Sequence, residues 1–333
     1  MDRTTAEKEW LRRISGGRPA APQGKPTSDQ TSDQSSSKPR PKPQPTAKKH
    51  GNGFGDIAGM EDLKQRVKED FINVLQHRDL ADAYGIRPPS MLFYGPAGCG
   101  KTFFAEKMAE EVGIHFIKVV PDDLASTMVH GTQEKIGEVF KNAERHAPAL
   151  LFFDEFDAMV PRRTGNEYNQ HYDSEVNEFL CMLNHASDKG VYVLAATNHP
   201  ERIDKAVLRT GRIDELVYVD MPDHEARKSL FALELAKLPR EEDIDMDRLA
   251  HLTQGYNCSD INYIVKSAAR KKFNEAIGCG EHTLQNITQK QLEEIISGRS
   301  PSVSSRDLRE YQRVHREFSP KDRDGQPASI GFR

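Results

Sequence analysis

Large apolar side chains are absent from a long stretch near the start of this 333-residue chain. Residues 15–53 contain no Ile, Leu, Val, Met, Phe, Tyr or Trp, and they include seven prolines. Such a segment cannot bury enough apolar surface to offset the entropy lost on ordering, so we predict a disordered arm over residues 1–53. Within it, residues 5–14 place Trp10 and two aliphatic side chains at helical spacing. Two interpretations stay open, an unstructured terminus or a short helix that docks on a partner.

The pattern changes at Phe54, after which short apolar runs alternate with segments of helical period. The apolar runs have the length of buried strands and cover residues 91–94, 115–120, 150–153, 191–196 and 216–219. The helical segments between them include residues 102–111, 132–145 and 174–183. Strands that alternate with helices predict a parallel sheet with helices on both faces, an α/β domain over residues 54–222.

Strand-like runs stop at Pro222, and the rest of the chain has helical periodicity only. We therefore predict a second, smaller all-α domain over residues 223–298. Residues 299–333 are expected to hold one more amphipathic helix, over residues 305–318, and a polar tail.

Charge and cysteine usage narrow the class of protein. The arm carries eleven Lys or Arg and five Asp or Glu, which gives it a net charge of +6. Because the whole chain has a net charge of −4, the rest of the chain carries −10. No run approaches the roughly 18 apolar residues of a membrane span, and the N-terminus lacks the apolar region of a secretory signal. The four cysteines are scattered without metal-ligand spacing, which favours a reducing compartment and a soluble, cytoplasmic protein.

A glycine-rich loop lies between a predicted strand and a predicted helix. It matches the pattern GxxxxGK[ST] and consists of Gly95, Pro96, Ala97, Gly98, Cys99, Gly100, Lys101 and Thr102. The glycines let backbone N–H groups turn towards phosphates, Lys101 reaches the β- and γ-phosphates, and the Thr102 hydroxyl binds Mg²⁺. The pattern predicts a P-loop site for ATP and Mg²⁺, with Phe103 at its edge.

Two carboxylates follow the apolar run at residues 150–153. Asp154 is expected to hold Mg²⁺ together with Thr102, and Glu155 is placed to polarise the attacking water. Two acids after an apolar run are usually a simple charge pair at a strand end. Their position after a P-loop lysine favours the catalytic interpretation.

With both elements in view, residues 54–318 resemble the AAA clade of the AAA+ ATPases, the group of valosin-containing protein, katanin, spastin and the proteasome regulatory ATPases. The resemblance rests on FGDIAG at 54–59, DEFDA at 154–158, ATNHP at 196–200 and IDKAVLRTGRID at 203–214. It implies that Asp56, Ile57 and Ala58 border the adenine. It also implies that Asn198 is the sensor that aligns the water with the γ-phosphate.

The same resemblance implies a ring, expected to be a homo-hexamer. The family's second region of homology places Arg209 and Arg212 beside the ATP of a neighbouring subunit. There a guanidinium is well shaped to accept the charge that spreads over the phosphoryl oxygens. The alternative is that both arginines pair on the surface with Asp204 or Asp214.

Two segments depart from the family's pattern. Cys258 and Ser259 stand where the family has a small Gly-Ala pair in the helical lid over the nucleotide, so their extra bulk is expected to alter nucleotide affinity. The pore loop that grips substrate lacks its aromatic residue and contains Met128, Val129 and His130. A second loop, which includes Tyr168, either supplies the missing contact or is simply solvated.

Cys99 also has two interpretations. Its position near a helix N-terminus and Lys101 is of the kind that lowers a thiol pKa and favours reactivity. The alternative is that it merely replaces a threonine of similar size.

These features predict an ATPase whose ring remodels, unfolds or disassembles protein substrates, with an adaptor or client bound by residues 1–53. An alternative is an ATP-dependent assembly switch or loader that acts on nucleic acid or on a partner complex without threading. Nucleic acid is not expected as a partner, because no winged helix, zinc module or basic aromatic sheet is found in the sequence. The sequence has no HExxH motif, and intact Lys101, Asp154 and Glu155 argue against a catalytically dead scaffold.

Overall fold

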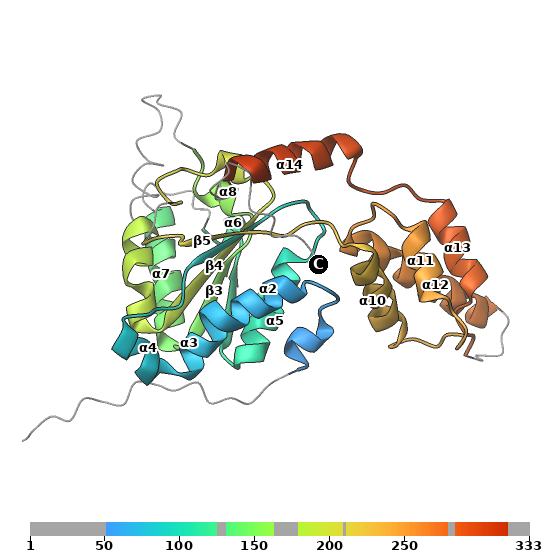
Figure 1. The fold of residues 1–333 in the computed structure, drawn as a ribbon, viewed down its shortest axis with the longest axis horizontal. Coiled ribbons are helices and arrows are strands. Elements are labelled where there is room, and N and C mark those ends of the chain that lie inside the picture. Colours follow the sequence, from blue (N-terminus) through green and yellow to red (C-terminus); the bar gives the residue numbers. More distant parts are fainter. Residues whose placement is uncertain (1–50, 125–130, 163–178, 209–210, 279–283, 319–333) are drawn as a thin grey trace, which may run out of the picture. The chain divides into compact units, whose positions relative to one another are not determined.

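Five short strands form one parallel sheet among the residues that the structure describes (Figure 1). In this computed structural model these are residues 51–318 without 125–130, 163–178, 209–210 and 279–283. The strands are β1 (Met91–Tyr94), β2 (His115–Val119), β3 (Ala149–Phe153), β4 (Val191–Thr197) and β5 (Glu215–Tyr218). Their order is β2-β3-β4-β1-β5, with every neighbouring pair parallel. The predicted fold class is confirmed, and each strand end lies within one residue of the predicted run.

Alternation of side chains along the strands gives the sheet two apolar faces. Phe93 and Phe152 belong to a core that includes α2 (Glu61–Val67), α3 (Asn73–Gln76) and α5 (Lys101–Val112). Their neighbours Leu92 and Phe153 belong to a second core, built with α7 (Gly131–Arg145) and the helical residues 179–186 (Figure 1). Because both faces are covered, β1, β3 and β4 are buried along their whole length. The outer strands β2 and β5 also carry partly exposed residues, among them Lys118 and Glu215.

Short elements complete this part of the chain. Before β1 lie η1 (Gly53–Asp56), the π-helix η2 (Lys68–Ile72) between α2 and α3, and α4 (Arg78–Tyr84). Between the later strands lie α6 (Pro121–Leu124), α8 (Phe156–Met159), η4 (Ser187–Lys189) and η5 (Pro200–Arg202). The start of the helix predicted over 174–183 lies outside the described residues, as do the helix predicted over 5–14 and the tail from residue 319.

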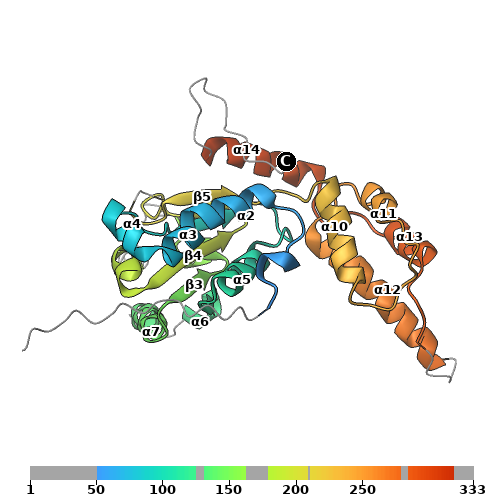
Figure 2. The same cartoon turned by 60° about the horizontal axis from the view of Figure 1, so that its bottom comes forward.

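Helices alone follow β5 in the described residues. They are α10 (His224–Leu235), α11 (Met246–Leu252), α12 (Cys258–Gly278) and α13 (Gln289–Ser297) (Figure 2). These helices share an apolar core around Phe231, Leu249 and Ile264. We call this group of four helices the lid. A last helix, α14 (Ser305–Phe318), lies apart from the lid and packs on β1 and β5 through His315. None of the helices described here is long and apolar enough to cross a membrane.

Candidate active site

The glycine-rich loop connects β1 to α5 at the carboxyl edge of the sheet. Gly95 has φ +144°, and a Cβ atom there would lie 2.2 Å from the carbonyl oxygen of Val219. Gly98 has φ +76°, and a Cβ atom there would lie 2.5 Å from Nδ2 of Asn257. Any other residue would therefore clash at both positions. Helix α5 begins at Lys101, and its N-cap residue Gly100 provides no side-chain cap, so the first backbone N–H groups of the helix are available to an anion.

Lys101 is the buried cation of this loop, with only 7% of its surface exposed. Its Nζ donates to the carbonyl oxygens of Gly95 and Pro96 at 2.9 and 2.8 Å, and to Oδ1 of Asn198 at 2.7 Å. Burial lowers the pKa of Lys101 to about 8. The three partners are neutral oxygens, so phosphate oxygens beside Nζ would favour the charged form of the lysine. The environment of Lys101 therefore fits a polyphosphate.

The two predicted magnesium ligands lie together where β3 ends. The Thr102 hydroxyl donates to Oδ2 of Asp154 at 3.0 Å. Hydroxyl and carboxylate oxygens are ligands that Mg²⁺ prefers, so this donor set fits the ion. Lys118 on β2 also contacts Oδ2 of Asp154, at 2.8 Å, and would compete with a cation for the same oxygen. No motif in the sequence pointed to Lys118, although its position on the strand next to β3 follows from the strand order.

Glu155 differs from Asp154 in conformation and exposure. Its backbone is left-handed, with φ 50°, and its side chain is exposed. The backbone N–H of Glu155 donates to Oδ1 of Asp154 at 3.1 Å, which helps to hold this turn. A non-glycine residue in this backbone region costs free energy and is a recurrent feature of functional sites. The turn leaves the Glu155 carboxylate in solvent, where a water molecule can reach it.

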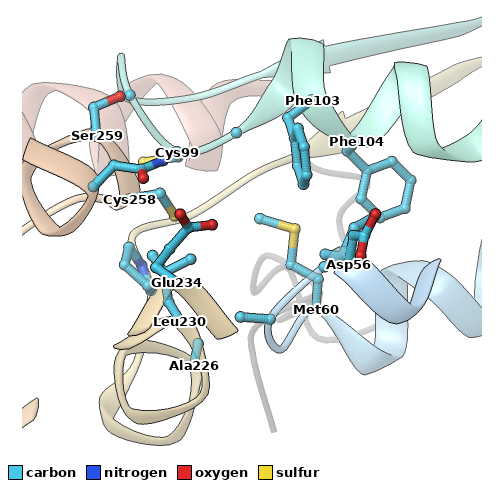
Figure 3. A pocket seen from close by; sticks show the side chains of 16 residues that line it. Asp56, Met60, Cys99, Phe103, Phe104, Ala226, Leu230, Glu234, Cys258 and Ser259 are labelled. Carbon is cyan, nitrogen blue, oxygen red and sulfur yellow. The ribbon is translucent and has the colours of Figure 1, made fainter. Parts of the chain in front are cut away.

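A cavity of about 190 Å³ adjoins the loop on the side of the lid. Its walls include the predicted nucleotide contacts Asp56, Ile57, Ala58, Gly98, Cys99, Gly100, Phe103, Cys258 and Ser259. Figure 3 shows Leu230 and Glu234 of α10 facing Met60 and the α5 phenylalanines across this cavity. The mixture of an apolar wall with a few polar groups is typical of sites for a base and a sugar.

Several wall residues were missed by sequence analysis. Ala226, Leu230 and Glu234 are spaced four apart on α10, so they share one helical face. That periodicity was visible in the sequence, but nothing in it indicated which face of α10 meets the loop. The Glu234 carboxylate contacts Nζ of Lys237 at 3.2 Å, which offsets its negative charge near the loop.

Of the two interpretations of Cys99, the one with a lowered thiol pKa is wrong. Cys99 is fully buried, and its Sγ lies 3.6 Å from Sδ of Met221. Burial raises the pKa of the Cys99 thiol well above its ordinary value, and the opposing effect of Lys101 is smaller. Burial also raises the pKa of Cys258, to about 11. Both thiols are therefore protonated at neutral pH, which favours the interpretation that Cys99 is a packing residue.

Other predicted site residues are only partly placed. The Arg212 guanidinium donates to the carbonyl oxygen of Ala206 at 2.7 Å, within its own chain. Its predicted partner Asp214 instead accepts from the backbone of Ser90 and Gly211, at 3.3 and 2.8 Å. Arg209 lies outside the described residues, as do the pore-loop residues Met128, Val129, His130 and Tyr168.

Comparison with known proteins agrees with this geometry. Residues 91–221 match the model of the ATPase family associated with various cellular activities (AAA). The chain is 33% identical over 273 residues to a cell division cycle protein 48 homolog of Archaeoglobus fulgidus. This alignment covers 79% of this chain and 37% of that protein. The chain is also 33% identical over 243 residues to a putative cell division cycle ATPase of Plasmodium falciparum, which covers 72% of this chain and 19% of that protein. The chain therefore spans well under half the length of these relatives.

The matched region runs from β1 to the residue before Pro222 and contains the loop, Asp154 and Asn198. Fold, family match and relatives agree with the resemblance that the motifs indicated. Residues 91–221 of the chain belong to the AAA family of ATPases.

Proposed function

We propose that this chain works as one subunit of a homo-hexameric ring that hydrolyses ATP to remodel, unfold or disassemble protein substrates. The observation that supports it best is the convergence of Lys101, Asp154 and Asn198 at one edge of the sheet. These side chains come from the loop after β1 and from the ends of β3 and β4, which are adjacent or nearly adjacent strands. A buried cation and a carboxylate at one strand edge suit phosphoryl transfer, which depends mainly on positioning and charge stabilisation.

Each group has a distinct task in this proposal. Lys101 and the N-terminus of α5 hold the phosphates. Thr102 and Asp154 hold Mg²⁺, which supplies neutralising charge to the phosphate oxygens when bound. Glu155 accepts a proton from the attacking water, and Asn198 orients that water. Oδ1 of Asn198 accepts a hydrogen bond from Nζ of Lys101 at 2.7 Å, so the residue proposed to orient the water lies beside the residue proposed to bind phosphate.

The Glu155 role has a direct test. Glu155→Gln should bind ATP with wild-type affinity and hydrolyse it at least about a hundredfold more slowly, because the amide cannot accept the proton. Binding is measured by calorimetry and hydrolysis by phosphate release. Asp157→Asn, two residues further along, is not a matched control because Asp157 contacts Thr197 in β4. The exposed Asp188→Asn is the better control, and a normal rate in Glu155→Gln would remove the proposed mechanism.

The ring is the second part of the proposal. Arg209 and Arg212 are proposed to act on the ATP of the neighbouring subunit, so a ring in which every subunit carries Arg209→Ala should be inactive. Mixing these subunits with Glu155→Gln subunits should restore hydrolysis, because some interfaces then pair an intact arginine with an intact glutamate. Phosphate release is measured across mixing ratios at constant total protein. A rate that stays at the sum of the two parent rates would rule out catalysis between subunits.

The substrate class needs its own experiment, because the pore-loop residues lie outside the described residues. Phosphate release is measured with increasing amounts of a permanently unfolded polypeptide, and in parallel with single-stranded DNA. Stimulation by the polypeptide alone is expected from a protein remodeller. Stimulation by DNA alone would favour the nucleic-acid loader instead. Repeating the titration without residues 1–53 shows whether the arm contributes to substrate binding.

A further inference from the structure

The phosphate loop is held at its start by the last described helix. Tyr94, the residue directly before Gly95, has a hydroxyl 2.9 Å from Nδ1 of His315 on α14. The His315 ring stacks on Tyr218 of β5, with centroids 4.2 Å apart and planes 17° apart. This contact joins α14 to the ends of β1 and β5. Helix α14 therefore fixes the point where the loop leaves the sheet.

A second contact holds the middle of the loop. Asn257, which is 3% exposed, donates from Nδ2 to the carbonyl oxygen of Ala97 at 3.0 Å. At the following residue of the loop, the carbonyl oxygen of Gly98 accepts from the backbone N–H of Ser259 at 3.1 Å. Two successive peptide groups of the loop are thus bonded to the start of α12.

Asn257 is itself held in place. Its Oδ1 accepts from the backbone N–H of Asp260 at 2.8 Å, and Asp260 Oδ2 accepts from the backbone N–H of Asn257 at 3.4 Å. This reciprocal pair is a capping box, which fixes both side chains at a helix N-terminus. The orientation of Asn257 therefore depends on Asp260.

Asp260 is tied to the segment that follows the lid. It is fully buried, and its carboxylate accepts from the Arg299 guanidinium at 2.7 Å and from the backbone N–H of Ser302 at 3.0 Å. The Ser302 hydroxyl donates to it as well. Burial raises the pKa of Asp260, but the hydrogen bonds from Ser302 and Arg299 outweigh this effect and the pKa lies below its ordinary value. A buried carboxylate of this kind needs its donors, so residues 299–302 support the capping box.

Both contacts therefore end in the same segment, from Arg299 to Phe318. We propose that residues 299–318 are a positioning element of the phosphate loop, which they hold at Tyr94 through His315 and at Ala97 through Asp260 and Asn257. The inference rests on the proposed function only in taking this loop as the nucleotide site. A loop that is already ordered loses less conformational entropy when it binds phosphate, so the segment raises nucleotide affinity without touching the nucleotide.

The test uses two conservative changes in the full chain. Asn257→Asp keeps a good helix cap but replaces the amide donor that reaches Ala97 with an oxygen. Tyr94→Phe keeps the ring in the core but removes the hydroxyl that meets His315. Tyr84→Phe on α4 is the matched control, because Tyr84 is largely exposed. The measurements are amide hydrogen exchange of residues 95–102 without nucleotide and ADP affinity by calorimetry.

Each variant should exchange faster over residues 95–102, while residues 149–153 of β3 keep wild-type protection. ADP affinity should fall by about 3–10-fold, as expected when a hydrogen bond that orders a site is lost. Wild-type exchange in both variants, or wild-type ADP affinity in both, would overturn the inference. If the wild-type chain bound no ADP, the proposed function would fail. The exchange measurement would then decide the positioning inference alone, since it needs no nucleotide.

Discussion

The two sides of the nucleotide site are built on different principles. The sheet side places charged and polar groups in direct contact, with Lys101 2.7 Å from Asn198 and Thr102 3.0 Å from Asp154. The lid side contributes a wall in which Leu230 and Ala226 are apolar, Cys258 is a neutral thiol at pH 7, and the carboxylate of Glu234 is paired with Lys237. Charged contacts depend on distance and protonation, whereas apolar contacts depend mainly on buried area.

This difference predicts two grades of mutational effect. Changes to the buried charges of the sheet side should remove binding or chemistry, because a buried charge or its partner is lost. Changes on the lid side should alter nucleotide affinity by small factors and leave the chemical step intact, because no lid residue in the cavity wall is assigned to proton or phosphate transfer.

Lys101→Ala should lower ATP affinity by on the order of a hundredfold or more, since charge-assisted hydrogen bonds to phosphate are each worth about 1.5–3 kcal/mol. Calorimetric titration with ATP measures the change. Lys141→Ala, an exposed lysine on α7, is the control and should bind as wild type. Full affinity in Lys101→Ala would mean that the loop is not a phosphate site and would end the distinction between the two sides.

ATP affinity should also fall as the pH rises above about 8. Burial lowers the pKa of Lys101 to about 8 in the free chain, so the lysine loses its charge above this pH. Bound phosphate favours the charged form, so binding takes up a proton there, and affinity should fall by about tenfold per pH unit for one linked proton. The check is the ATP dissociation constant between pH 7 and 9.5. A Lys101→Arg chain should bind with a flat pH profile, because arginine stays charged.

Lys118→Met should lower the Mg²⁺ concentration needed for half-maximal hydrolysis. Lys118 contacts the same Asp154 oxygen as Thr102, and removing it leaves that oxygen to the metal ion. A partly exposed ion pair is worth about 0.2–1 kcal/mol, so the shift should be no more than about fivefold. Lys189→Met, which breaks the exposed pair with Glu144, is the matched control. An increase in the Mg²⁺ requirement would show that Lys118 assists the ion instead.

Leu230→Ala should produce the smallest effect, a loss of roughly fivefold in ATP affinity with an unchanged maximal rate. The leucine lines the cavity, and losing part of its buried surface costs about 1 kcal/mol or somewhat more. Leu233→Ala, on the same helix but absent from the cavity wall, is the control. If Leu230→Ala lowered the maximal rate instead, the lid would take part in the chemical step.

Much of the sheet side could be predicted from the sequence. The three central strands β1, β3 and β4 are fully buried runs bounded by loops. The loop motif has few alternative structures, because Gly95 and Gly98 have left-handed backbones that other residues rarely adopt. The strand order then brings Asp154 and Asn198 to the edge where the loop lies.

The remaining part of the site depends on tertiary packing. The motif placed Cys99 beside a lysine and a helix N-terminus, but the packing of Met221 and the lid buries the thiol and reverses the direction of its pKa shift. No local sequence motif points to Glu234, Asn257 or Lys118. Their roles depend on contacts between elements that are far apart in the sequence. Asn257 reaches Ala97 across 160 positions of sequence.

The strand order also affects the synthesis of this protein. Strand β1, which leads into the phosphate loop, pairs with β4 from Leu194 to Thr197 and with β5 from Glu215 to Tyr218. Both partners leave the ribosome about a hundred residues after β1, so its apolar segment waits without its native neighbours while the chain is made. Such edges are prone to pair with other chains. The sheet side of the ATP site is thus completed only when β5 emerges, and this interval is when the nascent chain should depend most on chaperones.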